Sequence, residues 1–396
     1  MFNQMNNSKI FLVLFLSVFI DLIGFGLIVP LLPFYAEYFG AGPQVVTLVV
    51  ATYSLMQFIC IPFWGNLSDR FGRRPIILAS IAGSGLSYLL FAFANSLWML
   101  FAARAFSGAM GSTIAVAQAY MADITTPENR AKGMGLIGAA IGGSFALGPA
   151  IGGILAGSDP ENLNFQLPFF AAASLSLVAL VFAIFALPES RSSDAVAENR
   201  QKSKKGLSAL IAASKNFQVL LFISILFLVG IAFSGIESVF TLWTKRELNW
   251  GPEQNGYLFM LVGIVGIVVQ AGLIGTLTKR FRESRLMISG LVFLGMGLVL
   301  IPFSNNLGQL LVGWMFVGIG IAIFRPTSNS LLSQSASPER LGITLGAAQS
   351  AFALSRIIGP IWAGFVFSVF GRDWPFFSGA ILLLVAVAIA LFIIRK

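Results

Sequence analysis

The stretch Gly65-Asn-Leu-Ser-Asp69-Arg70-Phe-Gly72-Arg73-Arg74-Pro75 lies between two long apolar runs. It holds three arginines and an aspartate, in a chain of which only 10% of residues are charged and 57% are hydrophobic. Where charge is this scarce, a charged cluster is expected to face water rather than hydrocarbon. The stretch therefore predicts a loop at a membrane surface, with a membrane helix on either side.

Apolar runs of the length needed to cross a bilayer recur through all 396 residues, and the mean hydropathy is +0.86. A soluble protein of this composition could not cover its apolar surface. The pattern predicts an all-α membrane protein with twelve transmembrane helices. The predicted spans are 10–33, 44–64, 76–94, 97–121, 133–157, 167–187, 217–243, 254–277, 285–303, 307–332, 341–369 and 375–394.

Most basic residues fall in alternate predicted loops and at the two chain ends. This is the positive-inside pattern, so we expect a multi-pass protein of the cell (inner) membrane with both termini in the cytoplasm. This distribution explains the net charge of +9 by membrane topology, so nucleic-acid binding is not expected. With one cysteine, Cys60, and no histidine, neither a metal site nor a cofactor is expected.

The chain also contains an internal repeat at an offset of 210–211 residues. Gly108 parallels Gly318, and Gly148-Pro149 parallels Gly359-Pro360. Further matches in the same register are 93–97 with 303–307, 127–128 with 338–339, and Gly65 with Gly275. A same-direction repeat of six helices is a known transporter arrangement. We predict an N-terminal six-helix bundle (1–187), a polar cytoplasmic linker (188–215) and a C-terminal six-helix bundle (216–396).

Four segments resemble motifs of the major facilitator superfamily, and in particular its twelve-helix drug:proton antiporters and tetracycline efflux carriers. These are the charged stretch 65–74, the acidic first helix 21–30, the segment Arg104-x-x-x-Gly108 in the fourth helix, and Gly148-Pro149-x-x-Gly152-Gly153 in the fifth. The resemblance implies two six-helix halves that expose a central site alternately to each side of the membrane. One position departs from it, because Ser87 stands where tetracycline carriers usually have an aspartate.

Intramembrane charge is costly and usually has a function. Asp21 is the leading candidate for proton coupling, because burial penalises a charged carboxylate and lets it take up and release a proton. The alternative is a static ion pair with an arginine. Arg104, on a stripe with Gly108, Gly111, Ala115 and Gln118, could influence that protonation, as the resemblance implies, or could bind backbone carbonyls instead.

Other polar side chains within the predicted helices suit the lining of a substrate cavity for an amphipathic organic molecule. Two intramembrane arginines in the second half favour an anionic or zwitterionic substrate. The candidate cavity residues are Tyr53, Gln57, Gln118, Glu237, Arg325, Gln349 and Arg356.

The charged stretch and the fifth-helix glycines suit conformational switching. The residues Gly65, Asp69, Arg70, Gly72, Arg73 and Arg74 predict a charge latch that holds one state, and the alternative is a simple positive-inside anchor. Gly148, Pro149, Gly152 and Gly153 predict a thin helix that packs closely against a neighbour.

Together these features predict a proton-coupled secondary transporter that exports small amphipathic molecules, working as a monomer. The alternative is a carrier of the same fold for a sugar, metabolite or lipid-like solute. An enzyme or receptor is disfavoured because the sequence shows no nucleophile–base pair, metal set or sensing domain. Nucleotide-driven pumping has no support, since no phosphate-binding glycine loop is present.

Overall fold

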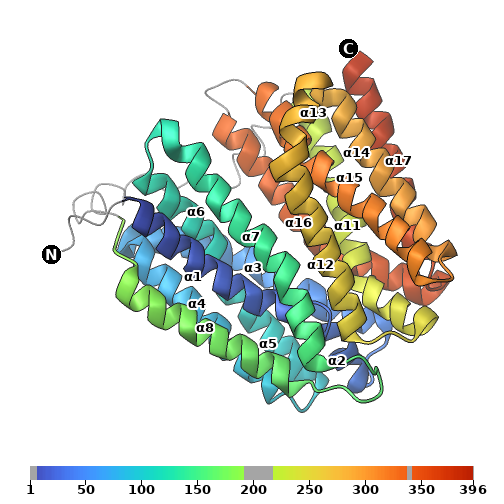
Figure 1. Ribbon diagram of the computed structural model, residues 1–396, viewed down its shortest axis with the longest axis horizontal. Coiled ribbons are helices and arrows are strands. Elements are labelled where there is room, and N and C mark those ends of the chain that lie inside the picture. The colour runs from blue at the N-terminus through green and yellow to red at the C-terminus, as the bar shows by residue number, and fades with distance from the viewer. Residues whose placement is uncertain (1–6, 191–216, 337–340, 396) are drawn as a thin grey trace. The chain divides into compact units, whose positions relative to one another are not determined.

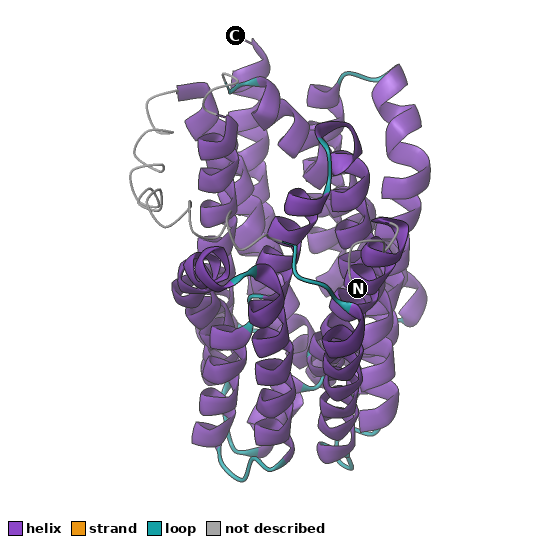
Figure 2. Ribbon diagram, turned by 90° about the vertical axis from the view of Figure 1, so that its left-hand side faces the viewer, coloured by secondary structure: helices purple, strands orange, loops and turns teal. Residues whose placement is uncertain are grey.

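The computed structural model describes residues 7–190, 217–336 and 341–395. All the regular structure in these ranges is helical, and short loops join the helices (Figures 1 and 2). The linker predicted at 188–215 lies outside the described residues except for Pro188–Ser190, which follow the sixth membrane helix.

The helices of the N-terminal half follow the predicted spans with three exceptions. The predicted first span, 10–33, is interrupted by a turn after Ile28. The predicted fourth helix is broken at Gly111–Ser112, and the charged stretch is mostly helix rather than loop, so that Gly72 alone separates the second and third membrane helices. The elements are α1 (Asn7–Ile28), α2 (Leu32–Tyr38), α3 (Pro43–Phe71), α4 (Arg73–Ala92), α5 (Leu97–Met110), α6 (Thr113–Ile124), α7 (Pro127–Ala156) and α8 (Gln166–Ala186).

The C-terminal half contains the other predicted helices, and one of them is irregular. A π-helical turn at Val269–Leu273 interrupts the predicted span 254–277. The elements are α11 (Phe217–Leu248), α12 (Pro252–Val268), α13 (Ile274–Arg280), α14 (Glu283–Leu300), α15 (Leu307–Gln334), α16 (Leu341–Phe370) and α17 (Trp374–Arg395), with a short 3₁₀ turn at Ile301–Phe303.

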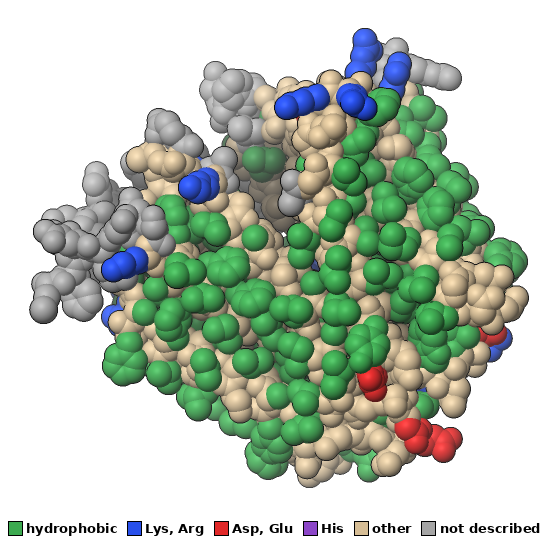
Figure 3. All heavy atoms as spheres, in the orientation of Figure 1, with side chains coloured by type: hydrophobic (Ala, Val, Ile, Leu, Met, Phe, Trp, Pro, Cys, Tyr) green, Lys and Arg blue, Asp and Glu red, His purple; other side chains and the backbone are tan. Residues whose placement is uncertain are grey.

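Eleven helices in the described residues are long and apolar enough to cross a membrane. The predicted eighth span is the one missing from that count, because its helical run from Pro252 to Arg280 is divided by the π-helical turn. Hydrophobic side chains cover much of the face shown in Figure 3, and few charged side chains lie among them. The chain is therefore a multi-pass integral membrane protein.

The chain forms two compact units. The first comprises the described residues within Met1–Gly40, Thr52–Lys204 and Trp250–Tyr257, and the second those within Ala41–Ala51, Lys205–Asn249 and Leu258–Lys396. The start of α3 thus belongs to the second unit, where Gly364 of α16 packs against Thr47. The start of α12 belongs to the first unit, where Gly256 packs against Pro149.

The same helix pairing occurs in both units. In the first, α1 packs against α7 and α8, and α4 packs against α8 and the α5/α6 pair. In the second, α11 packs against α16 and α17, and α14 packs against α17 and α15. These pairs correspond under the sequence offset, so the internal repeat is also a repeat of structure.

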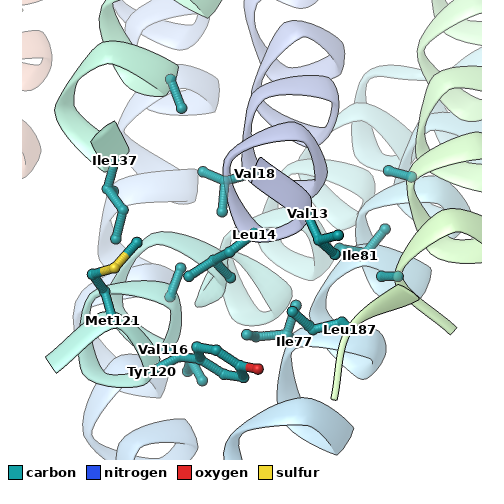
Figure 4. Close-up of a cluster of buried hydrophobic side chains, with 14 of the residues drawn as sticks. Val13, Leu14, Val18, Ile77, Ile81, Val116, Tyr120, Met121, Ile137 and Leu187 are labelled. Carbon is teal, nitrogen blue, oxygen red and sulfur yellow. The ribbon is translucent and has the colours of Figure 1, made fainter. Parts of the chain in front are cut away.

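A buried apolar cluster in the first unit packs together α1, α4, α6, α7 and α8. Leu14 and Val18 of α1, Ile77 and Ile81 of α4, and Tyr120 of α6 meet there (Figure 4). Interior packing of this density fixes the helix ends that carry the charged residues described below.

Candidate transport and coupling sites

Asp21 lies in the interior of the first unit, with 4% of its surface exposed. The hydroxyl groups of Ser84 on α4 and Thr113 on α6 lie beside its carboxyl group. Its Oδ1 atom accepts no hydrogen bond from the described residues. Residues of α1, α4 and α6 thus place two hydroxyl groups beside one buried carboxyl group, and no donor among the described residues reaches its Oδ1 atom.

Arg104 of α5 is also buried, and it lies among aromatic rings. Its guanidinium carbon is 4.9 Å from the ring centroid of Tyr53 and 5.7 Å from that of Phe25. Arg104, Asp21 and Tyr53 all lie close enough to Tyr88 to interact with it electrostatically. The two residues predicted to couple protons therefore have Tyr88 as a common neighbour.

Tyr53 and Gln57, predicted to share a face of the second helix, do so. Gln57 Nε2 donates to Tyr53 Oη at 3.1 Å and to the carbonyl of Gly111 at 2.8 Å. A Cβ atom at Gly108 or Gly111 would collide with Tyr53, so both glycines are needed for α5 to approach α3. Both hydrogen bonds donated by Gln57 Nε2 are therefore made to other groups of the protein.

The prediction that Arg104, Gly108, Gly111, Ala115 and Gln118 form one continuous helical stripe is wrong. The helix ends at Met110 and restarts at Thr113. Side chains of neighbouring helices satisfy the freed backbone groups: Gln57 binds Gly111, and Trp64 Nε1 donates to the carbonyl of Ala109 at 2.6 Å. Gln118 lies beyond the break and is exposed.

In the second unit, two of the predicted cavity residues line one pocket. Arg325 and Gln349 face a cavity of about 60 Å³ together with Asn329 and Phe352. The Arg325 guanidinium lies 4.9 Å from the Phe352 ring centroid. Arg325 also interacts electrostatically with Arg356 and Glu237. The C-terminal bundle therefore holds a cationic, aromatic-walled pocket, to which the sequence prediction had not assigned Asn329, one helical turn after Arg325.

Arg73 is the centre of the predicted latch. Its side chain, 8% exposed, binds Asp69 Oδ1 at 2.7 Å, Asp123 Oδ2 at 3.0 Å and the Ser68 hydroxyl at 2.5 Å. Arg70 is exposed and packs over the ring of Phe71. The charged stretch is thus divided between one buried arginine with carboxylate partners and an arginine directed to the surface.

Sequence reasoning missed the role of Glu189. Its carboxylate accepts hydrogen bonds from the backbone N–H groups of Arg73 at 2.8 Å and Arg74 at 3.1 Å, so it caps the start of α4. Gly72 has a φ of +98°, and a Cβ atom there would meet the Glu189 carboxylate. The only sequence signal was a Pro-Glu pair after the sixth helix. Gly65, in contrast, has open space around it.

The fifth-helix glycines lie at close helix contacts. Cβ atoms at Gly148 and Gly152 would collide with the α1 backbone at Gly26 and Leu27, and one at Gly153 would collide with Pro252. In the second unit, Gly359 packs in the same way against the α11 backbone at Ile231. Close approach of the backbones is the physical requirement that only glycine meets at these positions.

Among the described residues, no group of three or more histidine, cysteine, aspartate or glutamate side chains could hold a metal ion. The arrangement consists instead of two bundles of membrane helices that repeat one pairing, and the first of them has charged side chains buried inside it. A repeated pair of membrane-helix bundles of this kind is typical of secondary transporters.

Comparison with known proteins gives the family. The model of the Major Facilitator Superfamily matches residues 14–282 and 271–396, so the chain belongs to that superfamily. The tetracycline resistance protein, class C, of Escherichia coli is 29% identical over 381 residues, which are 93% of this chain and 92% of that protein. Multidrug resistance protein 2 of Bacillus subtilis (strain 168) is 29% identical over 398 residues, 98% of this chain and 96% of that protein.

A solved structure agrees on the fold. A bacterial homologue of the human lysosomal transporter Spinster superposes with a TM-score of 0.80 at 14% sequence identity, and the match covers 98% of this chain and 97% of that one. The predicted superfamily and its all-helical membrane fold are confirmed.

Proposed function

We propose that this protein exports small amphipathic organic molecules across the cell (inner) membrane in exchange for protons, by alternating access and as a monomer with both termini in the cytoplasm. The names of its relatives, tetracycline and multidrug resistance proteins, support drug-like cargo. The observation that carries the proton coupling is Asp21, a buried acid whose Oδ1 accepts no hydrogen bond from the described residues. We assign the transported proton to this carboxyl group.

We also propose which residues contact the substrate, and we consider the polar side chains of the two bundles one bundle at a time. The pocket at Arg325, Gln349 and Phe352 combines a cation, an amide and an aromatic ring, which suits an anionic or zwitterionic amphiphile. Tyr53, Gln118, Glu237 and Arg356 are the further contacts we propose. Ser87 is buried, and its hydroxyl donates to the Ser84 carbonyl at 2.7 Å, so this position adds no negative charge for a metal–tetracycline cation.

We assign switching to the charged cluster and the α7 glycines. Arg73, Asp69 and Asp123, with Gly72 and Arg74 held by Glu189, are the latch that favours one conformational state. Gly148, Pro149, Gly152 and Gly153 allow the close packing that seals the carrier. Arg70 and Gly65 contribute less, because one packs on a surface ring and the other has open space around it.

The test is reconstitution into liposomes that carry a pH gradient and an internal pH dye. Addition of an amphipathic drug should dissipate the gradient in wild-type vesicles. The Asp21→Asn variant should show no drug-induced proton movement, because an amide cannot carry the proton. The matched control is Asp159→Asn, the same change at an exposed acid in the loop after α7, which should behave as wild type.

Two outcomes would contradict the proposal. Wild-type proton movement in Asp21→Asn would remove Asp21 from the coupling. Dissipation by sugars or metabolites, with no response to tetracycline, quinolones or other amphiphiles, would favour the alternative of a solute carrier of the same fold.

A further inference from the structure

The break in the fourth membrane helix is not needed to connect the chain, since the apolar pattern continues through it. It lies at Gly111–Ser112, between α5 and α6, and it brings the first residue of α6, Thr113, beside Asp21. Ser112 and Thr113 are 1% and 3% exposed. Breaking a helix away from water leaves backbone groups that must find other partners, so a buried break requires support.

Ser80 of α4 supplies that support. Its hydroxyl donates to the carbonyl of Met110, accepts the backbone N–H of Ser112 at 3.2 Å, and lies 2.9 Å from the hydroxyl of Thr113. One side chain from a neighbouring helix therefore binds both sides of the interruption. Ser84, one turn further along the same face of α4, is the other hydroxyl beside Asp21.

The hydrogen atoms available to this cluster determine what Thr113 can do. A hydroxyl has one hydrogen to donate and two lone pairs to accept with. Because the Ser80 hydrogen is directed to the carbonyl of Met110, Ser80 can only accept from Thr113. Thr113 can therefore adopt two hydrogen-bonding arrangements. When Asp21 is charged, the Thr113 hydroxyl donates to it. When Asp21 is protonated, the Thr113 hydroxyl donates to Ser80 and accepts from Asp21.

We propose that the helix break positions the Thr113 hydroxyl between Ser80 and Asp21, so that Thr113 hydrogen-bonds the Asp21 carboxyl group in both of its protonation states. Thr113 and Ser80 are then positioning residues for proton transfer at Asp21. This inference rests on the proposed role of Asp21 as the proton carrier. A hydroxyl that rotates between two acceptors lets the carboxyl group gain and lose its proton while no helix has to move.

Few other charged or titratable groups face this cluster. Tyr88 of α4 interacts with Asp21, and it is shared with Arg104 of α5 and Tyr53 of α3. The other helices packed on α1 add no charge at this depth, because α8 contains no charged residue and α7 carries its charges only in its first turns. Removal of one of these hydroxyl groups should therefore change the pH dependence of transport through Asp21.

The experiment measures the pH dependence of drug-driven proton movement in reconstituted Thr113→Val, which has nearly the same shape but no hydroxyl. A hydrogen bond to a charged acceptor is about twice as strong as one to a neutral group, so Thr113 supports the carboxylate more than the protonated acid. Its loss should move the pH midpoint of transport upward by roughly half to one unit. Thr113→Ser, which keeps the hydroxyl, should restore the wild-type midpoint.

The matched control is Thr125→Val. Thr125 lies just after the last residue of α6, and its hydroxyl donates to the carbonyl of Met121 at 2.7 Å, within one turn of chain and away from Asp21. Its midpoint should equal that of wild type. Infrared difference spectra of the purified protein give a second measurement, because the carboxyl band that disappears in Asp21→Asn should move to higher frequency in Thr113→Val as the acid loses a hydrogen-bond partner.

The outcomes distinguish a failure of this inference from a failure of the proposed function on which it rests. If Asp21→Asn keeps drug-driven proton movement, the proposed function fails. If Asp21→Asn abolishes it while Thr113→Val keeps the wild-type midpoint and the wild-type carboxyl band, the proposed function stands and the role of Thr113 is refuted. An upward shift that occurs equally in Thr113→Ser would also refute it, since packing rather than the hydroxyl would be the cause.

Discussion

The two units carry the same contact between helix ends, but with different chemistry. In the first unit, Arg73 at the start of α4 binds Asp123 near the end of α6, with 3.0 Å between Nε and Oδ2. In the second unit, Glu283 at the start of α14 accepts a hydrogen bond from Gln334 at the end of α15, also at 3.0 Å. The pairs are related by the offset of 210–211 residues that relates the rest of the repeat.

Burial separates the two copies. Arg73 is buried and also binds Asp69 and Ser68, whereas Gln334 is exposed. At the position equivalent to Asp69 the second unit has Lys279, which is exposed. The repeat therefore needs a polar contact here to join two helix ends, but it does not need an ion pair. The ion pair of the first unit is thus not a requirement of the repeated fold, and this difference is the basis on which we propose the latch in that copy.

The largest effect should come from removing the buried cation. Arg73→Met removes the cation that Asp69 and Asp123 both bind, and we expect the unfolding free energy in detergent micelles to fall by about 2–3 kcal/mol. The figure is reduced from that of a fully buried pair because Asp69 and Asp123 are 38% and 22% exposed. Arg70→Met, the same change at an exposed arginine of α3, is the control and should cost less than about 0.5 kcal/mol. Equal losses in the two variants would remove the distinction between a latch and a surface charge.

A second prediction concerns Gly72, the single residue that joins α3 to α4 in the first unit. Gly72 lies at φ +98° and ψ 163°, a conformation that is essentially limited to glycine, and its missing Cβ leaves room for Glu189. Gly72→Ala should lower the unfolding free energy by about 2 kcal/mol. Gly65→Ala, in the same segment but inside a helix with open space, should be neutral or stabilising by up to about 1 kcal/mol. If both substitutions were neutral, the turn would not depend on the special conformation of Gly72.

The third prediction removes the cap. Glu189→Ala takes away the acceptor for two N–H groups at the start of α4, and should cost about 1 kcal/mol by thermal or chemical unfolding, as other helix caps do. Because Glu189 is exposed, its charge is screened. Glu189→Gln keeps an oxygen acceptor for one of the two N–H groups, so it should recover up to about half of the loss. A full loss in Glu189→Gln would show that charge, rather than the hydrogen bonds, is what matters.

The sequence predicted most of the helices but not these contacts. The membrane spans follow from apolar runs that need no knowledge of their neighbours. The charged stretch was predicted to be a loop because charge marks the membrane surface, yet a helix can continue into water, and α3 does so until Gly72. The break between α5 and α6 left no trace in the apolar pattern, since side chains from α3 and α4 stabilise it.

The residues of the candidate site also fall into two groups, those that the sequence could indicate and those that it could not. Asp21, Arg104, Arg325 and Gln349 could be selected because a polar residue within an apolar run stands out. Ser80, Ser84 and Thr113 could not, because a hydroxyl in a membrane helix usually bonds its own backbone, as that of Ser17 does with Val13. Glu189 could not be found either, because its partner Arg73 is 116 residues away in the chain. Contacts of that kind depend on the fold and are not visible in any local pattern.

The smallest effect should come from the second copy. Glu283→Gln keeps the shape of the side chain and replaces a charged hydrogen-bond acceptor by a neutral one beside the exposed Gln334, so the unfolding free energy should change by less than about 0.5 kcal/mol. Drug-driven proton movement should also be unchanged, whereas Arg73→Met should alter the balance between inward- and outward-facing states, as measured by accessibility of single cysteines introduced at each end of the helices. Because the two substitutions change equivalent contacts in one repeated frame, a similar response in both would mean that switching is shared between the units. A response confined to Arg73 would mean that the first copy alone has kept the ion pair because it is broken and remade in transport.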